Sequence, residues 1–114
     1  MNTIFAQLNN PYVRIAKIVI DSSQLDGYKM AVKEHAQAAV KAEPGVIALY
    51  AVYDKDQPTH VTVFEIYADK NAYEQHIQTS HFKKYKSSTL NMVKSLQLTD
   101  VIPIALQEKT GKLN

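Results

Sequence analysis

The sequence of 114 residues contains no cysteine and no tryptophan. The lack of cysteine excludes disulfides, thiolate nucleophiles and thiolate metal ligands. No apolar run approaches the roughly 20 residues that a membrane-spanning helix needs. The first ten residues also lack the basic and apolar regions of a signal peptide. We therefore expect a cytoplasmic protein with no membrane partner, while an exported mature chain that had lost its signal peptide would show the same pattern.

Charged residues are scattered along the chain, with 13 lysines and arginines against 11 acidic residues. No basic stripe or block stands out, so we expect no nucleic-acid partner. The hydrophobic fraction of 46% is ordinary for a globular protein, and the length suits a single domain. We expect an N-terminal arm at residues 1–11, a domain at residues 12–106 and a polar C-terminal tail at residues 107–114.

The hydrophobic pattern predicts alternating strands and helices. Runs of β-branched and aromatic residues indicate strands, which we place at residues 12–20, 46–53, 60–68 and 101–106. A stripe of apolar residues at spacings of three and four predicts a helix at residues 23–42, ended by the proline and glycine that follow. Asp69 can cap a second helical region, which is interrupted at Thr79 and Ser80 and continues to about Leu96.

The order β-α-β-β-α-β predicts an α+β fold, the ferredoxin-like sandwich, with both helices on one face of a four-stranded antiparallel sheet. The other face of this sheet would be bare. The strand at residues 46–53, VIALYAVY, has no polar face, and a strand of this kind is buried on both sides. We therefore expect a homodimer in which two sheets pack face to face about a two-fold axis.

Ionisable and aromatic side chains are densest at the end of the third strand and in the helix after it. Alternation along the strand places Glu65 and Tyr67 on one face among aliphatic residues. His76 lies on the strand-facing side of its helix and His81 at a helix start. Because imidazole titrates near pH 6.5, each histidine is a candidate general base; the alternative is a packed histidine bonded to the backbone or to Glu65. A buried Glu65 needs a partner, for which a histidine or Lys17 would serve.

Several aromatic residues could line a pocket for a flat, hydroxylated ligand. Their ring faces stack on ligand rings, and a phenol can bond a ligand oxygen. The candidates for substrate binding, with ordinary core or interface packing as the alternative, are Tyr50, Tyr73, Phe82, Tyr85 and His35.

The sequence does not indicate a metal site. His76 and His81 are five residues apart, whereas ligands on one helix prefer spacings of three or four, and no third ligand is evident from the pattern. Arg14 on the first strand is a candidate either for an anion contact or for a salt bridge between subunits.

Short motifs in the chain follow one another in a recognisable order. They are Glu43-Pro44-Gly45, Glu65-Ile66-Tyr67, the set Asp69, Ala72 and His76, and Thr79-Ser80-His81-Phe82. Over roughly residues 12–106 the chain thereby resembles the antibiotic biosynthesis monooxygenase (ABM) family. This resemblance implies a homodimeric α/β-barrel with a pocket between sheet and helices in each subunit. It also implies relatives that oxygenate quinols or anthrone-like polyphenols with O2 and no cofactor, others that isomerise a phosphorylated autoinducer-2 sugar, and others that degrade haem.

The chain departs from the family pattern at two positions. Many members place a tryptophan where Tyr67 stands, and the haem-degrading members pair it with an asparagine about where Val63 stands. The sequence therefore does not favour haem degradation, and we expect no cofactor. Three functions stay open: a cofactor-independent monooxygenase of a quinol-like small molecule, an isomerase of a small hydroxy-ketone, and a non-catalytic ligand-binding dimer. In the two enzymatic cases His76 or His81 would remove a proton, and Tyr67, with Tyr50 as a second candidate, would stabilise the oxyanion.

Overall fold

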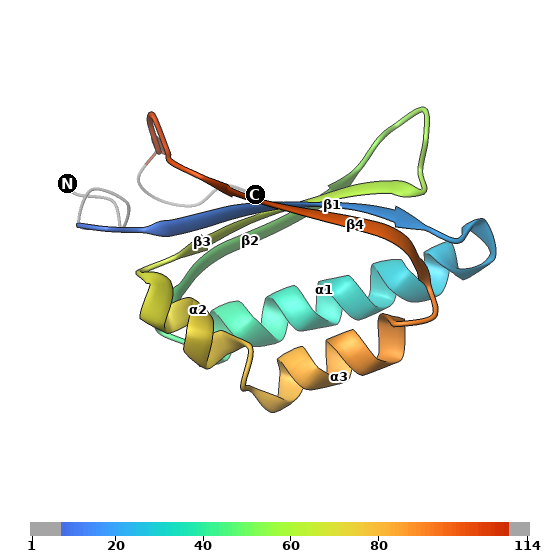
Figure 1. Cartoon of the computed structure of the whole chain (residues 1–114), viewed down its shortest axis with the longest axis horizontal. Helices are drawn as coiled ribbons and strands as arrows, with labels where there is room; N and C mark the ends of the chain where they lie inside the picture. Colours follow the sequence, from blue (N-terminus) through green and yellow to red (C-terminus); the bar gives the residue numbers. More distant parts are fainter. Residues whose placement is uncertain (1–7, 110–114) are drawn as a thin grey trace.

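The computed structural model describes residues 8–109 as one sheet covered on one face by helices (Figure 1). The strands are β1 (Tyr12–Ile20), β2 (Val46–Tyr53), β3 (His60–Tyr67) and β4 (Val93–Val101). The helices are the short 3-10 helix η2 (Ser22–Gln24), α1 (Leu25–Ala42), α2 (Lys70–His76) and α3 (Ser80–Thr89). Residues 1–7 of the predicted arm and residues 110–114 of the predicted tail lie outside the described residues.

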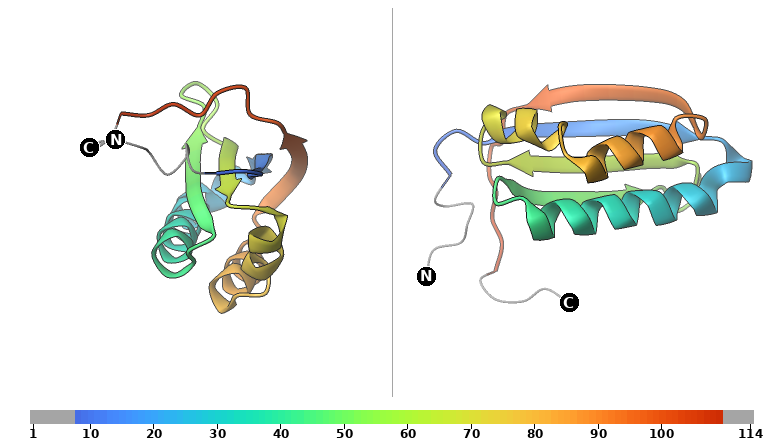
Figure 2. Two further views of the ribbon diagram at one scale, coloured as in Figure 1. Left: turned by 90° about the vertical axis from the view of Figure 1, so that its left-hand side faces the viewer. Right: turned by 90° about the horizontal axis from the view of Figure 1, so that it is seen from below.

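The sheet has the strand order β2-β3-β1-β4, and all of its neighbouring strands are antiparallel. The two central strands pair in register from Tyr12 opposite Tyr67 to Val19 opposite His60. All helices lie on the same side of the sheet, as two further views show (Figure 2). The predicted α+β ferredoxin-like fold is therefore confirmed. Within residues 8–109, no helix is both long and apolar enough to cross a membrane.

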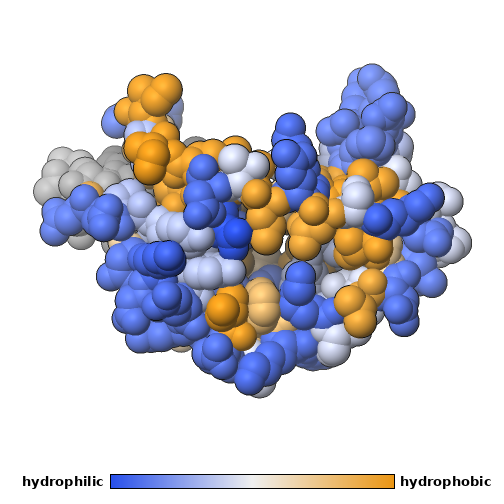
Figure 3. Space-filling model, viewed as in Figure 1, coloured by the Kyte–Doolittle hydropathy of each residue, from blue (hydrophilic) through white to orange (hydrophobic). Residues whose placement is uncertain are grey.

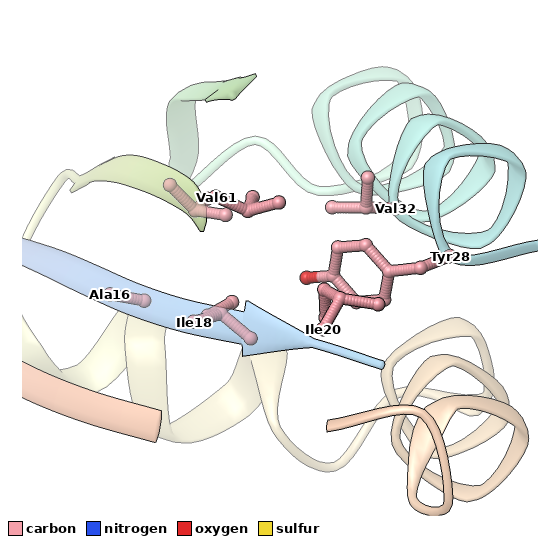
Figure 4. Packing of buried hydrophobic residues seen from close by; sticks show 7 residues of the cluster. Ala16, Ile18, Ile20, Tyr28, Val32 and Val61 are labelled. Carbon is pink, nitrogen blue, oxygen red and sulfur yellow. The ribbon is translucent and has the colours of Figure 1, made fainter. Parts of the chain in front are cut away.

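Helix α1 packs on the sheet through one stripe of side chains. Its buried residues, Tyr28, Val32, His35 and Ala39, recur at spacings of three and four, which places them on one helical face. Tyr28 and Val32 point toward Ile18 and Ile20 of β1 and toward Val61 of β3, and these residues form the main core cluster (Figure 4). The stripe predicted from the sequence is thus the surface that joins helix and sheet.

The prediction for the last part of the chain was wrong. The second helical region ends at Thr89, and the last strand is β4 at Val93–Val101 rather than at residues 101–106. A spacing of four, as between Met92 and Leu96, satisfies the period of a strand as well as that of a helix. In the structure Leu96 pairs with Ile18 in the β4–β1 ladder. The strand therefore lies along β1 and forms an edge of the sheet.

Gly45 supports a close contact between the end of α1 and the start of α2. A Cβ atom added at Gly45 would lie 2.5 Å from the Cβ of Ala72, whereas one added at Gly27 would meet only the flexible end of Met92 at 3.4 Å. The Gly45 carbonyl also accepts a hydrogen bond from the Ala68 amide at 2.8 Å. Only glycine fits this approach without a shift of the backbone around it.

We expect Gly45→Ala to lower the free energy of unfolding by about 1–3 kcal/mol, the usual cost of overpacking. Gly27→Ala is the matched control, because alanine in a helix is favoured over glycine by up to about 1 kcal/mol. Urea unfolding of both variants checks this. Equal stability of Gly45→Ala and the parent protein would show that the contact can relax freely.

Candidate active site

A cavity of about 530 Å³ lies between the helix-covered face of the sheet and the helices. Residues of β1, β3 and β4 line it on the sheet side, and residues of α1, α2 and α3 line it on the helix side. Hydrophobic side chains gather around a hollow between β4 and α3 (Figure 3). A mostly apolar cavity of this volume, with a few polar groups, is typical of a site for a small molecule.

Most of the predicted site residues line this cavity. They are His35, Glu65, Tyr67, Tyr73, His76, Phe82 and Tyr85. Strand alternation, which puts Val63, Glu65 and Tyr67 on the helix-facing side of β3, is confirmed by the burial of Val63 and Tyr67 and by the cavity.

Two predicted site residues lie elsewhere. Tyr50 is 51% exposed and pairs with Phe64 of β3, on the face of the sheet that carries no helix. An irregularity between Val46 and Ala48 in the β2–β3 ladder shifts the alternation by one residue, so Leu49 rather than Tyr50 faces the cavity. His81 borders a smaller hollow between α1 and α3 instead of the main cavity.

A carboxylate that the sequence interpretation did not assign to the site joins the two histidines. Glu43 Oε2 lies 2.8 Å from His76 Nδ1 and 2.5 Å from His81 Nε2. His76 is only 2% exposed, whereas the Glu43 side chain keeps 14% of its surface accessible. Glu43 follows the last residue of α1, and the pairing of Val46 with Tyr67 brings this end of α1 next to the start of α2. No local sequence signal pointed to Glu43, because this approach depends on how the strands pair.

The expected pair of Glu65 with a histidine or with Lys17 is not what the described structure shows. The Tyr67 hydroxyl donates to Glu65 Oε1 at 2.7 Å, and Lys17 is exposed. Burial raises the pKa of Glu65, although the Tyr67 hydrogen bond and the charge of Arg14 oppose the shift. Burial, followed by the charge of Glu65, also raises the pKa of Tyr67, which keeps its phenol protonated. Glu65 and Tyr67 therefore form a hydrogen-bonded pair on the cavity wall, in which the Tyr67 phenol is protonated and protonation of the Glu65 carboxyl is favoured.

Arg14 lines the cavity and contacts two polar side chains. Its Nε donates to Asp100 Oδ1 at 3.0 Å, and its Nη1 donates to the Tyr73 hydroxyl at 2.7 Å. The guanidinium carbon also lies 4.9 Å from the centre of the Tyr73 ring. The salt bridge of Arg14 with Asp100 is therefore within one chain, and the separate hydrogen bond from Arg14 holds the Tyr73 hydroxyl beside the cavity.

His35 lies in the middle of the aromatic group. Its ring stacks on Tyr85 with a centroid distance of 4.6 Å, and the Tyr85 hydroxyl lies 2.6 Å from that of Tyr28. Burial, followed by the charges of His76 and His81, lowers the pKa of His35 to about 4. The ring is therefore neutral at physiological pH. Its Nδ1 atom is buried and has no hydrogen-bond partner among residues 8–109.

The contact with Glu43 determines what His76 can do. A carboxylate oxygen accepts hydrogen bonds, so a neutral His76 carries its proton on Nδ1, where it donates to Glu43. The Nε2 atom then keeps its lone pair. His76 lines the cavity, so the arrangement offers an oriented base beside an apolar space.

Glu65→Gln tests the buried carboxyl. Because the pKa of Glu65 is raised in the fold, protonation stabilises the native state; this stability is complete below the unfolded pKa of about 4.3 and is lost as pH rises through the folded pKa. We expect the stability of the variant relative to the parent to rise as the pH increases from below the unfolded pKa through the raised folded pKa. Urea unfolding across this range measures the difference.

Glu34→Gln is the control for this prediction. Lys84 lies 2.6 Å from the exposed Glu34 carboxylate and lowers its pKa. The relative stability of Glu34→Gln should therefore change with pH in the opposite direction. A stability difference for Glu65→Gln that stayed constant with pH would contradict the raised pKa.

The sequence matches the family model for antibiotic biosynthesis monooxygenase over residues 11–88. A solved structure of a candidate antibiotic biosynthesis monooxygenase from Bacteroides thetaiotaomicron is 48% identical, with a TM-score of 0.86, and the match covers 88% of this chain and 97% of that one. A candidate monooxygenase from Lactobacillus acidophilus is 28% identical, with a TM-score of 0.80 and coverage of 82% and 44%. No protein of curated function matches the sequence.

A further structure, a candidate antibiotic biosynthesis monooxygenase from Nitrosomonas europaea, is 17% identical with a TM-score of 0.78, and it covers 83% of this chain and 91% of its own. That likeness shows the fold alone. The family match spans more than half of the chain, and the 48% identity extends over nearly all of it. The chain therefore belongs to the antibiotic biosynthesis monooxygenase family.

Proposed function

We propose that the protein is a cofactor-independent monooxygenase that acts on a quinol-like or polyphenolic small molecule with O2. Membership of the ABM family supports a monooxygenase-like function on a small molecule. The observation that carries the finer proposal is the Glu43–His76 pair, which holds one imidazole in a fixed orientation on the wall of a mostly apolar cavity.

The first step is removal of a proton from the substrate by His76 Nε2. A phenolic or benzylic proton moves to this nitrogen, and the imidazolium that forms is stabilised by the Glu43 carboxylate on Nδ1. The substrate anion is electron-rich and can transfer electrons to O2. For a CH2 group between aromatic rings, reaction with O2 gives a ketone and one water molecule, and the substrate supplies all the electrons.

Glu65 and Tyr67 are suited to stabilise the developing oxyanion. When Glu65 is protonated, as its raised pKa favours, the pair carries two hydroxyl hydrogens and uses one of them for its mutual hydrogen bond. The other hydrogen is then available for a substrate oxygen. Donors placed in a cavity with little water are most effective at stabilising such charge. This role replaces the sequence-based assignment of Tyr50, which lies on the other face of the sheet.

A second candidate function is isomerisation of a small hydroxy-ketone, and it is favoured by Glu65 as an acid and His76 as a base. Glu65 and His76 both line the cavity, and an acid with a base can move a proton between neighbouring carbons through an enediol. This reaction consumes no O2.

We expect O2 uptake with a panel of quinols and anthrones, persisting after dialysis against a chelator, and a fall in kcat of about 100-fold or more for His76→Gln. Glutamine can still donate to Glu43 but cannot act as a base. His60→Gln, an exposed position at the start of β3, is the matched control and should keep the parent rate. Circular dichroism confirms that both variants fold.

The other functions give different results in this experiment. Proton exchange beside a ketone without O2 uptake would favour the isomerase. Binding of a ligand with neither reaction would favour a non-catalytic domain. Full O2 uptake by a folded His76→Gln variant would refute the assignment of the base.

We also propose that the protein is a homodimer that covers the helix-free face of its sheet. Tyr50 and Val52 of β2 lie on this face and are 51% and 61% exposed. Phe64 of β3 and Ile15 of β1 are also only partly covered there. Exposed apolar groups that form one surface are typical of an interface.

Val52→Lys should therefore shift the protein toward a monomer in sedimentation velocity at micromolar concentration, because a charge would be desolvated between the sheets. Met30→Lys, at an apolar position on α1 that is 74% exposed, is the control and should leave the sedimentation coefficient unchanged. A parent protein that sediments as a monomer would contradict the dimer.

A further inference from the structure

We propose that Glu43, His76 and His81 form a binding site for a divalent first-row transition-metal ion such as Zn²⁺. Glu43 Oε2 lies 2.8 Å from His76 Nδ1 and 2.5 Å from His81 Nε2, and one ligand atom from each residue lies within 4.8 Å of the others. Two imidazoles with one carboxylate are a ligand set that binds zinc and other borderline metals. The sequence pattern did not indicate this site, because the three ligands come from the end of α1, from α2 and from α3.

The three side chains need only a small movement to hold an ion. Bonds of about 2.0–2.1 Å in a tetrahedral arrangement space the ligand atoms about 3.3 Å apart. The Glu43 carboxylate would therefore withdraw by about 0.5 Å from His76 and by about 0.8 Å from His81, while the two imidazole nitrogens would move toward each other. The side chains of Glu43 and His81 are 14% and 20% exposed. An ion can thus arrive from solvent without passing through the main cavity.

His35 provides a second and independent indication of a ligand. Its Nδ1 is buried without a partner among the described residues, and its ring centroid lies 5.1 Å from that of His76 and 5.9 Å from that of His81. A buried polar atom without a partner is destabilising and calls for an explanation. An ion between the other three side chains, with water completing its coordination, would bring a hydrogen-bond partner into this neighbourhood.

Metal binding would change which nitrogen of His76 carries the proton. A metal on Nδ1 takes the lone pair of that atom, so a neutral imidazole must carry its single proton on Nε2. Nε2 is the atom to which the proposed function assigns proton removal. No proton is lost overall, since it moves from one ring nitrogen to the other through solvent. Metal binding and oxygenation therefore exclude each other, and this last point alone rests on the proposed function.

Titration of the chelator-treated full chain with Co²⁺ tests the site without any assay of activity. We expect one ion per chain, with the visible d–d absorption of a four- or five-coordinate ion, and a weaker affinity by about 100-fold or more in Glu43→Gln and in His81→Gln. His60→Gln should bind like the parent. Zn²⁺ should displace Co²⁺ and raise the Tm of the parent but not of the two ligand variants.

The possible failures of the two proposals can be told apart. Absence of the d–d absorption with Co²⁺ in excess, or equal affinity in parent, Glu43→Gln and His81→Gln, would overturn the metal site. Loss of binding in His60→Gln alone would place the ion on the surface and would also overturn it. Where quinol-dependent O2 uptake is present, Zn²⁺ should suppress it and a chelator should restore it. Co²⁺ binding without any O2 uptake would support the site and count against the oxygenase alone.

Discussion

The arrangement of the site depends on one carboxylate shared by two imidazole rings. Glu43 at the end of α1 contacts His76 at the end of α2 and His81 in the first turn of α3. A buried charge is costly unless it is paired, so the carboxylate and the two rings hold one another in place. The same contact fixes the orientation of His76, which lines the cavity, while Glu65 and Tyr67 on the sheet form a separate hydrogen-bonded pair.

The fold could be predicted because its signals are local. Alternation along a strand and a stripe along a helix are visible within a few turns of chain, and they placed Glu65 and Tyr67 on the correct face of β3. The error at β4 arose where both periods fit the same residues. The position of Tyr50 on the helix-free face depends on one irregularity in β2, because a shift of one residue reverses every side chain after it.

The missing part of the site required tertiary information. Glu43 stands next to Pro44, where a helix must end, and that local role accounts for its position without any contact to a histidine. Its contacts with His76 and His81 span more than 30 residues of chain and three helices. Arg14 and Tyr73 meet in the same way, from the first strand and the second helix. Composition could suggest which residues do chemistry, but only the packing of α1 against α2 and α3 shows which ones touch.

The side-chain contacts between α3 and the α1 region determine the width of the helical side of the cavity. Side chains fasten α3 to α1 at two levels, through Glu43 with His81 and through the hydroxyls of Tyr28 and Tyr85. These links set the distance between α1 and α3, which lie together on one side of the cavity, while the sheet forms the other side. A substitution in either pair would change the distance between α1 and α3, and it would leave the pairing of the strands unchanged. The spacing of α1 and α3 is therefore set by side chains outside the strand ladders.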